Sequence, residues 1–110
     1  MQIVLIDPLM KYRAHCVSET LGLMYIAAVL RDAGHGVKII ATGLRSDAAL
    51  HPNDIVDADL VGVTATSALF GNASQVLATI RAWRPELPVI LGGAHATVST
   101  ESALRAGFEF

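Results

Sequence analysis

Several residue types are scarce in this sequence, and each shortage excludes a class of function. The 110 residues include one cysteine, Cys16, so the chain can form neither an internal disulfide nor a metal or cluster site built from paired cysteines. Aromatic residues make up 5% and charged residues 16% of the chain, and the net charge at pH 7 is −2. This composition supplies no basic, aromatic surface that would bind nucleic acid or an anionic membrane.

Long apolar runs and targeting signals are also lacking. The longest mostly apolar stretch, residues 21–30, is about half as long as the roughly 20 residues that a membrane-spanning helix needs. No basic segment precedes an apolar run at the N-terminus, so the sequence predicts no secretory signal peptide. We therefore expect a cytoplasmic protein with neither a nucleic acid nor a membrane as its partner.

Apolar residues, in contrast, make up 53% of the chain, enough to bury the core of one domain. They form short runs that alternate with amphipathic segments. The expected strands are residues 3–6, 37–40, 60–63 and 89–91, with residues 108–110 beginning a fifth. The first expected helix is capped by Ser18 or Thr20 and ends at Gly34. A short helix is expected at 53–57 and a longer one over 70–80. The last runs from Ser99 or Thr100 to Leu104 and is capped by Gly107.

This order of elements predicts the fold class. Strands that alternate with helices imply right-handed crossovers and an α/β, Rossmann-like (flavodoxin-like) doubly wound parallel sheet in three α/β/α layers. The chain ends where a fifth strand begins, so we expect an exposed sheet edge through which two copies could form a homodimer. In the first helix, Leu23, Ile26, Ala27, Leu30 and Ala33 have the spacing of one buried face, and Met24 and Tyr25 are expected to pack beside it.

The strand at 89–91 is followed by two glycines and, after one alanine, by a histidine. Gly92 and Gly93 leave the carboxyl end of this strand without side chains, so either the backbone turns sharply there or a bulky ligand lies against it. His95 is then either a ligand contact or a packed, hydrogen-bonded core histidine. Both interpretations stay open at the level of sequence.

Small hydroxyl side chains follow the strand at 60–63. Thr64, Thr66 and Ser67 should share the sheet edge with the glycine pair, because ligands of open α/β sheets bind outside the carboxyl ends of the strands. A bare strand end beside a hydroxyl-lined one is typical of a floor for a large, flat ligand. The same hydroxyls are also suited to capping helices or to buried hydrogen bonds.

The sequence motifs that bind the common ligands of this fold class are absent here. The segment between the first strand and the first helix has no glycine, which excludes the GxGxxG loop of dinucleotide-binding proteins, and a P-loop is absent as well. The first loop is also unlike the Ser/Thr/Gly-rich loop that holds a flavin phosphate. Asp7 stands alone, whereas a phosphoacceptor receiver domain needs clustered carboxylates.

Three separated blocks cover most of the chain and carry a resemblance. Residues 21–40 (LGLMYIAAVLRDAGHGVKII), 58–64 (ADLVGVT) and 88–97 (PVILGGAHAT) resemble, in order and spacing, the N-terminal cobalamin (B12)-binding domain of radical SAM enzymes. The resemblance implies that the nucleotide tail of cobalamin threads between the sheet and its flanking helices, while the corrin ring rests on the carboxyl edge. It implies the following cofactor-binding residues: Leu21, Gly22 and Leu23 as a wall, Thr64, Thr66 and Ser67 as hydroxyls, Gly92 and Gly93 as the space for the tail, and His95 beside the polar groups of the ligand.

One departure from related cobalamin domains concerns the metal. Domains of methyltransferases and mutases carry DxHxxG after the first strand, where the histidine replaces the lower cobalt ligand, but here Pro8 and Leu9 follow Asp7. His15 lies in the same loop at a different spacing. The radical SAM branch commonly lacks this motif, so its absence favours that branch. We assign no metal ligand and no catalytic residue in this chain.

We therefore expect residues 1–110 to form one cobalamin-binding domain, the N-terminal part of a longer chain. The implied parent is a B12-dependent radical SAM enzyme such as a methyltransferase, with S-adenosylmethionine and a [4Fe-4S] cluster in a downstream domain. The chain alone should position the cofactor without turnover, because the chemistry belongs to the cofactor. Two alternatives stay open: a cofactor-free Rossmann-like interaction or regulatory module, and a stand-alone corrinoid carrier.

Overall fold

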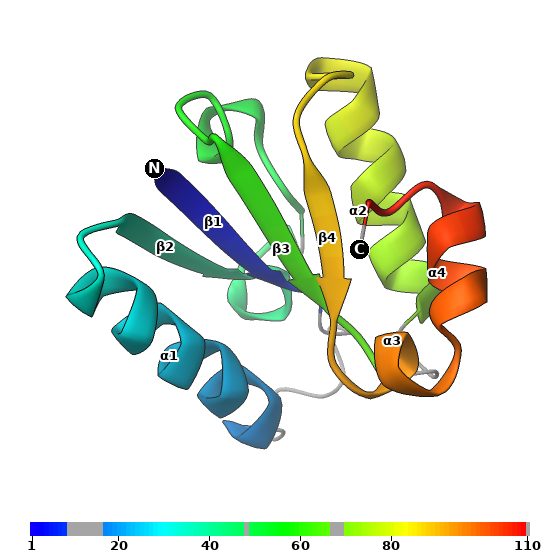
Figure 1. The fold of residues 1–110 in the computed structure, drawn as a ribbon. Helices are drawn as coiled ribbons and strands as arrows, with labels where there is room; N and C mark the ends of the chain where they lie inside the picture. Colours follow the sequence, from blue (N-terminus) through cyan, green and yellow to red (C-terminus); the bar gives the residue numbers. More distant parts are fainter. Residues whose placement is uncertain (9–16, 48, 67–69, 110) are drawn as a thin grey trace.

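Four parallel strands form one sheet at the centre of the protein (Figure 1). The computed structural model describes residues 1–8, 17–47, 49–66 and 70–109. The strands are β1 (Gln2–Asp7), β2 (Gly36–Ala41), β3 (Leu60–Thr64) and β4 (Val89–Gly92), in the order β2-β1-β3-β4. Every neighbouring pair is parallel. The four expected strands and the flavodoxin-like strand order are confirmed.

Helices cover the two faces of the sheet unequally (Figure 1). The helix α1 (Val17–Asp32) lies on one face, and α2 (Phe70–Trp83) and α4 (Thr100–Ala106) pack on the other, with the short α3 (Ala94–Val98) between β4 and α4. Two single-turn 3₁₀ helices, Thr42–Leu44 and Pro52–Asp54, lie in the connection from β2 to β3. This arrangement gives the three layers that the sequence predicts. None of the described helices is long and apolar enough to cross a bilayer.

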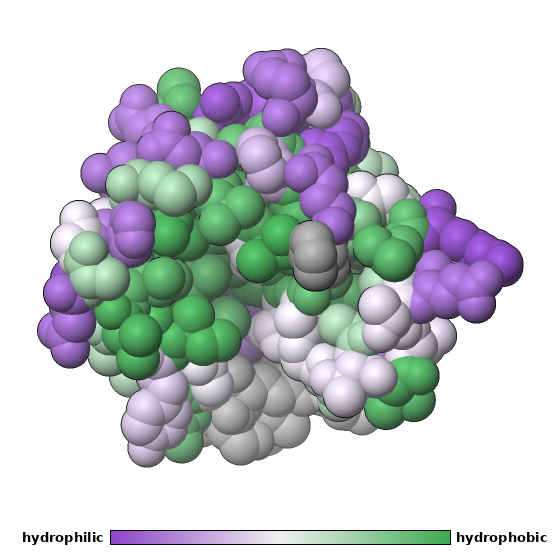
Figure 2. Space-filling view, viewed as in Figure 1, coloured by the Kyte–Doolittle hydropathy of each residue, from purple (hydrophilic) through white to green (hydrophobic). Residues whose placement is uncertain are grey.

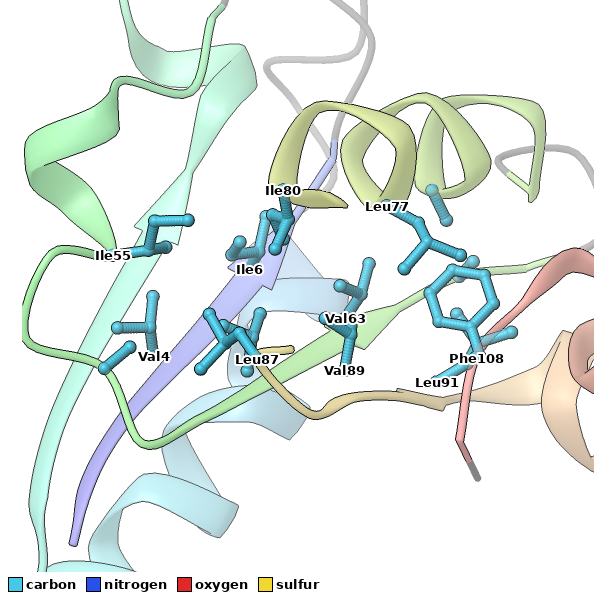
Figure 3. Close-up of a cluster of buried hydrophobic side chains, with 14 of the residues drawn as sticks. Val4, Ile6, Ile55, Val63, Leu77, Ile80, Leu87, Val89, Leu91 and Phe108 are labelled. Atoms are coloured by element: carbon cyan, nitrogen blue, oxygen red, sulfur yellow. The ribbon is translucent and has the colours of Figure 1, made fainter. Parts of the chain in front are cut away.

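Alternate strand residues build the core on the two faces, because successive side chains of a strand point to opposite sides. The larger cluster lies between the sheet and α2, and its residues include Val4, Ile6, Val63, Leu77, Ile80, Val89 and Leu91 (Figure 3). The smaller cluster joins Ile3 and Leu5 of β1 to Leu23 and Ala27 of α1. The strands are thus apolar on both faces, as buried parallel strands are.

The outward side of α1 differs from the expectation. Met24, Tyr25 and Ile26 are 54%, 69% and 51% exposed, and Ala33 is exposed too, so the predicted packing of these side chains is wrong. The helix contacts the sheet through Leu23 and its neighbours one turn apart, and within the described residues no second helix lies beside it. Figure 2 shows the result as a broad hydrophobic area over α1 and the adjoining strands.

Several helices begin or end at residues other than those expected from the sequence. The helix α1 begins at Val17, before both expected caps, and the short helix expected at 53–57 is the 3₁₀ helix Pro52–Asp54. The helix α3 was not expected. Gly34 and Gly107 have φ values of 93° and 106°, which confirms their predicted left-handed positions after α1 and α4.

The expected fifth strand is only begun in the described residues. Phe108 and Glu109 have no regular strand assignment, and Phe110 lies outside the described residues. The Glu109 N–H nevertheless donates a hydrogen bond to the Val89 carbonyl oxygen (2.9 Å) at the outer edge of β4. The buried side chain of Phe108 joins the core beside Leu77 and Leu91 (Figure 3).

Candidate functional site

The sheet has a topological switch point between β1 and β3. From β1 the chain moves outward to β2, and from β3 it moves the other way to β4, so the crossovers leave on opposite sides. The carboxyl ends of these strands meet at one edge, where the fully buried Asp7 ends β1 and Thr64 is in register with Gly92 of β4. Open α/β sheets bind ligands in the crevice at such a point.

Gly93 is a structural glycine at this edge. Its φ of 88° and ψ of −171° lie in a region that only glycine adopts readily. A Cβ atom at this position would lie 2.7 Å from Thr64 Oγ1 and 2.9 Å from the Ala65 carbonyl oxygen. The close approach lets the Ala65 N–H donate to the Gly92 oxygen (3.2 Å) and the His95 N–H donate to the Ala65 oxygen (3.0 Å). Gly93 therefore joins the ends of β3 and β4 and begins α3.

Gly92 has the opposite surroundings. It is exposed, its φ is not positive, and a Cβ atom added to it would meet no atom of the described residues within 4 Å. By strand alternation it faces the same side of the sheet as Ile90, the side of α1. Gly22 in α1 is exposed with the same open surroundings. The bare part of the edge is thus at Gly92.

His95 is buried, with 8% of its surface exposed. Its ring stacks on Phe70, with 3.9 Å between the ring centroids and 19° between the ring planes, and its Nε2 atom lies 2.8 Å from Ser102 Oγ. The Ser102 hydroxyl also donates to the Ser99 carbonyl oxygen (3.0 Å). These contacts tie α3 to the start of α2 and to α4, so the geometry favours the packed, hydrogen-bonded alternative for His95.

Replacing His95 with alanine should therefore lower the free energy of unfolding by about 2 kcal/mol, the sum expected for one buried hydrogen bond and one aromatic stack. Urea unfolding followed by circular dichroism measures the change. Val98→Ala in the same helix is the matched control, because Val98 is 81% exposed and its truncation should cost less than about 0.5 kcal/mol. A His95→Ala variant as stable as the wild type would contradict this structural role.

The other predicted site residues occupy different surroundings. Thr64 and Thr66 are half-buried at the edge, and Ser67 lies outside the described residues. On α1, Leu21 and Gly22 are exposed, whereas Leu23 is buried against the strands. The structure thus brings Thr64 together with both glycines of the pair, while Leu23 has a packing role.

Sequence reasoning missed a cavity of about 230 Å³ between α2 and the connection that follows β2. The polar residues of its described lining are uncharged, namely Thr42, Asn72, Gln75 and Thr79, beside Leu50 and Pro8. Thr42 Oγ1 donates to the Asp7 carbonyl oxygen (3.4 Å), and Asn72 Nδ2 donates to the Pro8 carbonyl oxygen (3.3 Å). The signal in the sequence is weak, namely three polar residues on one stripe of an amphipathic helix.

An ion pair holds the connection that forms one wall of this cavity. Arg45 contacts both carboxylate oxygens of Asp54, at 2.6 and 2.9 Å, and donates to the Ala49 carbonyl oxygen (3.1 Å). Asp54 also accepts a hydrogen bond from the His51 N–H (2.7 Å). The hydrogen bonds from Arg45 lower the pKa of Asp54 to about 2, against the opposing effect of burial.

Asp54→Asn should accordingly lower the free energy of unfolding at pH 7 by about 2 kcal/mol. Because the pKa of Asp54 is lower in the folded chain than in the unfolded chain, this stability is complete above about pH 4 and is lost as the pH falls through about 2. Urea midpoints of the two proteins from pH 7 downward measure the difference. Asp32→Asn, at the exposed end of α1, is the control, and an equal gap at every pH would contradict the assignment.

No metal-binding cluster is evident in the part of the chain that the structure describes, because no three His, Cys, Asp or Glu side chains gather there. His15 and Cys16 lie outside the described residues.

Comparisons with known proteins agree with this geometry. The family described as B12 binding domain matches residues 13–110. A protein of Pyrococcus horikoshii that is named an uncharacterized methyltransferase is 35% identical over 91 residues, which cover 77% of this chain and 19% of the relative. The chain thus spans about a fifth of the length of that relative.

Proposed function

This chain belongs to the B12-binding domain family, and on that premise we propose that it binds cobalamin across the carboxyl ends of β1, β3 and β4. The family match carries the proposal, because it extends over β3, β4 and the turn at Gly93. The space that the described residues leave beside Gly92 supports it. A cofactor-free module is expected to have a well-filled sheet edge, so the unfilled space among the described residues at Gly92 counts against that alternative.

The residues at this edge fit the group. Gly92 leaves room for a bulky ligand on the α1 side of the sheet, and the hydroxyls of Thr64 and Thr66 offer hydrogen bonds to its polar groups. Gly93 holds the two strand ends in place. When bound, cobalamin supplies a cobalt centre that carries a transferable group, and this chain binds and orients it.

Thermal unfolding tests the proposal. A ligand that binds only the folded chain stabilises it, by about 2.7 kcal/mol at a hundredfold excess over its Kd, so hydroxocobalamin should raise the Tm by several degrees. NAD is the matched control ligand, because the loop after β1 lacks the glycines of a dinucleotide site. A Tm unchanged by hydroxocobalamin would contradict cobalamin binding.

The length of the relative supports a second proposal, that this chain is one part of a longer protein. We propose that this chain is a module of a longer, cytoplasmic methyltransferase whose downstream radical SAM domain holds S-adenosylmethionine and a [4Fe-4S] cluster. The support is the name of the Pyrococcus horikoshii relative and the 19% of its length that this chain matches. The reading frame that encodes the complete protein tests this: a CxxxCxxC motif downstream supports the enzyme, and a stop codon supports a stand-alone corrinoid carrier.

The uncovered side of α1 fits the same context. Tyr25, Ile26 and Val29 expose apolar surface around a shallow apolar groove, and parallel sheets are normally covered on both faces. We propose that further polypeptide of the longer protein covers this face. Sedimentation of the complete protein and of the 110-residue chain tests this proposal. If the complete protein is a homodimer and the substitution Tyr25→Asp dissociates it, this face binds a second copy instead.

A further inference from the structure

The cavity between α2 and the connection after β2 carries an inference that rests on the proposed function and extends it. We propose that this cavity receives an uncharged amide arm from the periphery of the corrin ring. Acetamide and propionamide arms surround the corrin of cobalamin, so a protein that binds the ring at a sheet edge meets several of them.

The cavity opens beside the same edge as the candidate site. Pro8 follows the last residue of β1, and Asn72 lies in the first turn of α2, so both residues are at the carboxyl ends of the strands. Thr79 lies seven residues further along α2, about two helical turns deeper. The cavity therefore runs from the sheet edge along α2, and at about 230 Å³ it holds far more than the roughly 10–15 Å³ that one water needs.

Hydrogen bonds fix the rim of the cavity before any ligand binds. The carbonyl oxygens of Asp7 and Pro8, at the end of β1, accept hydrogen bonds from Thr42 and Asn72, respectively. These bonds satisfy two consecutive backbone acceptors and hold both side chains against the cavity. Such preorganisation lowers the entropy cost of binding a polar group.

The chemistry of the lining selects the ligand group. Amide N–H groups supply donors, and amide and hydroxyl oxygens supply acceptors, as an amide arm requires, since Thr42 and Thr79 already donate to the Asp7 and Gln75 carbonyl oxygens. Among the described residues, no charged side chain lines the cavity. Within the described lining, a carboxylate arm would find no cation to pair with, which is costly in a partly buried site. The lining thus favours an amide over the corresponding acid.

The test compares hydroxocobalamin with its separated monocarboxylates, in each of which one peripheral amide is hydrolysed. The variant is the double substitution Gln75→Leu with Thr79→Val, which leaves the bonds from Thr42 and Asn72 intact and so preserves the rim. Ser74→Val, on the same helix but outside the cavity lining, is the matched control. Circular dichroism verifies folding, and equilibrium titration gives each Kd.

We expect the wild type and the control to bind hydroxocobalamin about tenfold more tightly than one of the monocarboxylates. The double variant should bind hydroxocobalamin about tenfold more weakly, the effect of two lost hydrogen bonds, and should no longer distinguish that monocarboxylate. Equal binding of hydroxocobalamin by the variant and the wild type would overturn this inference and leave the proposed function standing. A folded wild type that binds no hydroxocobalamin would instead overturn the proposed function, and the inference with it.

Discussion

Replacing Gly93 with alanine should lower the free energy of unfolding by about 3 kcal/mol, a large share of the stability of a small domain. The backbone at this residue has φ 88° and ψ −171°, where a side chain is strained. The new Cβ would also lie 2.9 Å from the Ala65 oxygen and 3.1 Å from the Ala65 nitrogen, which are backbone atoms fixed by the sheet. The ends of β3 and β4 would have to separate to relieve these contacts.

The matched control for this substitution is the neighbouring residue. Gly92→Ala adds the same methyl group where no described atom lies within 4 Å, at a φ that alanine tolerates, so it should change stability by less than about 0.5 kcal/mol. Urea unfolding of both variants measures the difference. Equal stabilities would show that the turn at Gly93 is not the constraint that holds the edge together.

A larger side chain at Gly92 should have the second large effect, on binding rather than on stability. Gly92→Leu fills the open space on the α1 side of the sheet, so we expect the affinity for hydroxocobalamin to fall by about a hundredfold, a loss of about 2.7 kcal/mol. The stability should change by less than about 1 kcal/mol, because Gly92 is exposed. Equilibrium titration gives the affinity, and urea unfolding gives the stability.

Ala106→Leu is the control for the added side-chain volume. Ala106 is exposed at the last residue of α4 and is not one of the residues at the carboxyl ends of the strands. It should bind hydroxocobalamin as the wild type does. If Gly92→Leu also binds with unchanged affinity, the ligand does not lie against β4, and the proposed position of the site is wrong.

The sheet was predictable because its signals are local. Each strand is a short apolar run that turn residues interrupt, and the run Val89 to Leu91 stops where the glycines begin. Gly34 and Gly107 likewise mark helix ends by their conformational freedom, and both have the expected positive φ. The order of these elements then leaves few topologies.

The exposed side of α1 was not predictable for a physical reason. An apolar stripe in a sequence shows that a surface can be buried, but it does not show which neighbour buries it. Leu23 meets β1, whereas Ile26, also apolar, lies on the uncovered side. The sequence pattern is the same for both residues, and only the arrangement of the helices separates them.

The candidate site was predictable as a region and not residue by residue. Two adjacent glycines read alike in a sequence, yet Gly93 is constrained by Thr64 and Ala65, whereas no described residue would contact a side chain at Gly92. The histidine after them reads equally as a ligand contact or as a packed core residue, and only the fold shows that it stacks on Phe70 from a distant part of the chain. Both distinctions depend on contacts between segments, which residue spacing does not encode.

The measurement that tests the central claim most directly is retention of the cofactor. The chain is mixed with excess hydroxocobalamin, desalted, and examined by absorbance, while circular dichroism verifies that it is folded. The account predicts about one cobalamin retained per chain, with a spectrum that differs from that of the free cofactor. A folded chain that retains none would contradict the claim that this domain binds cobalamin.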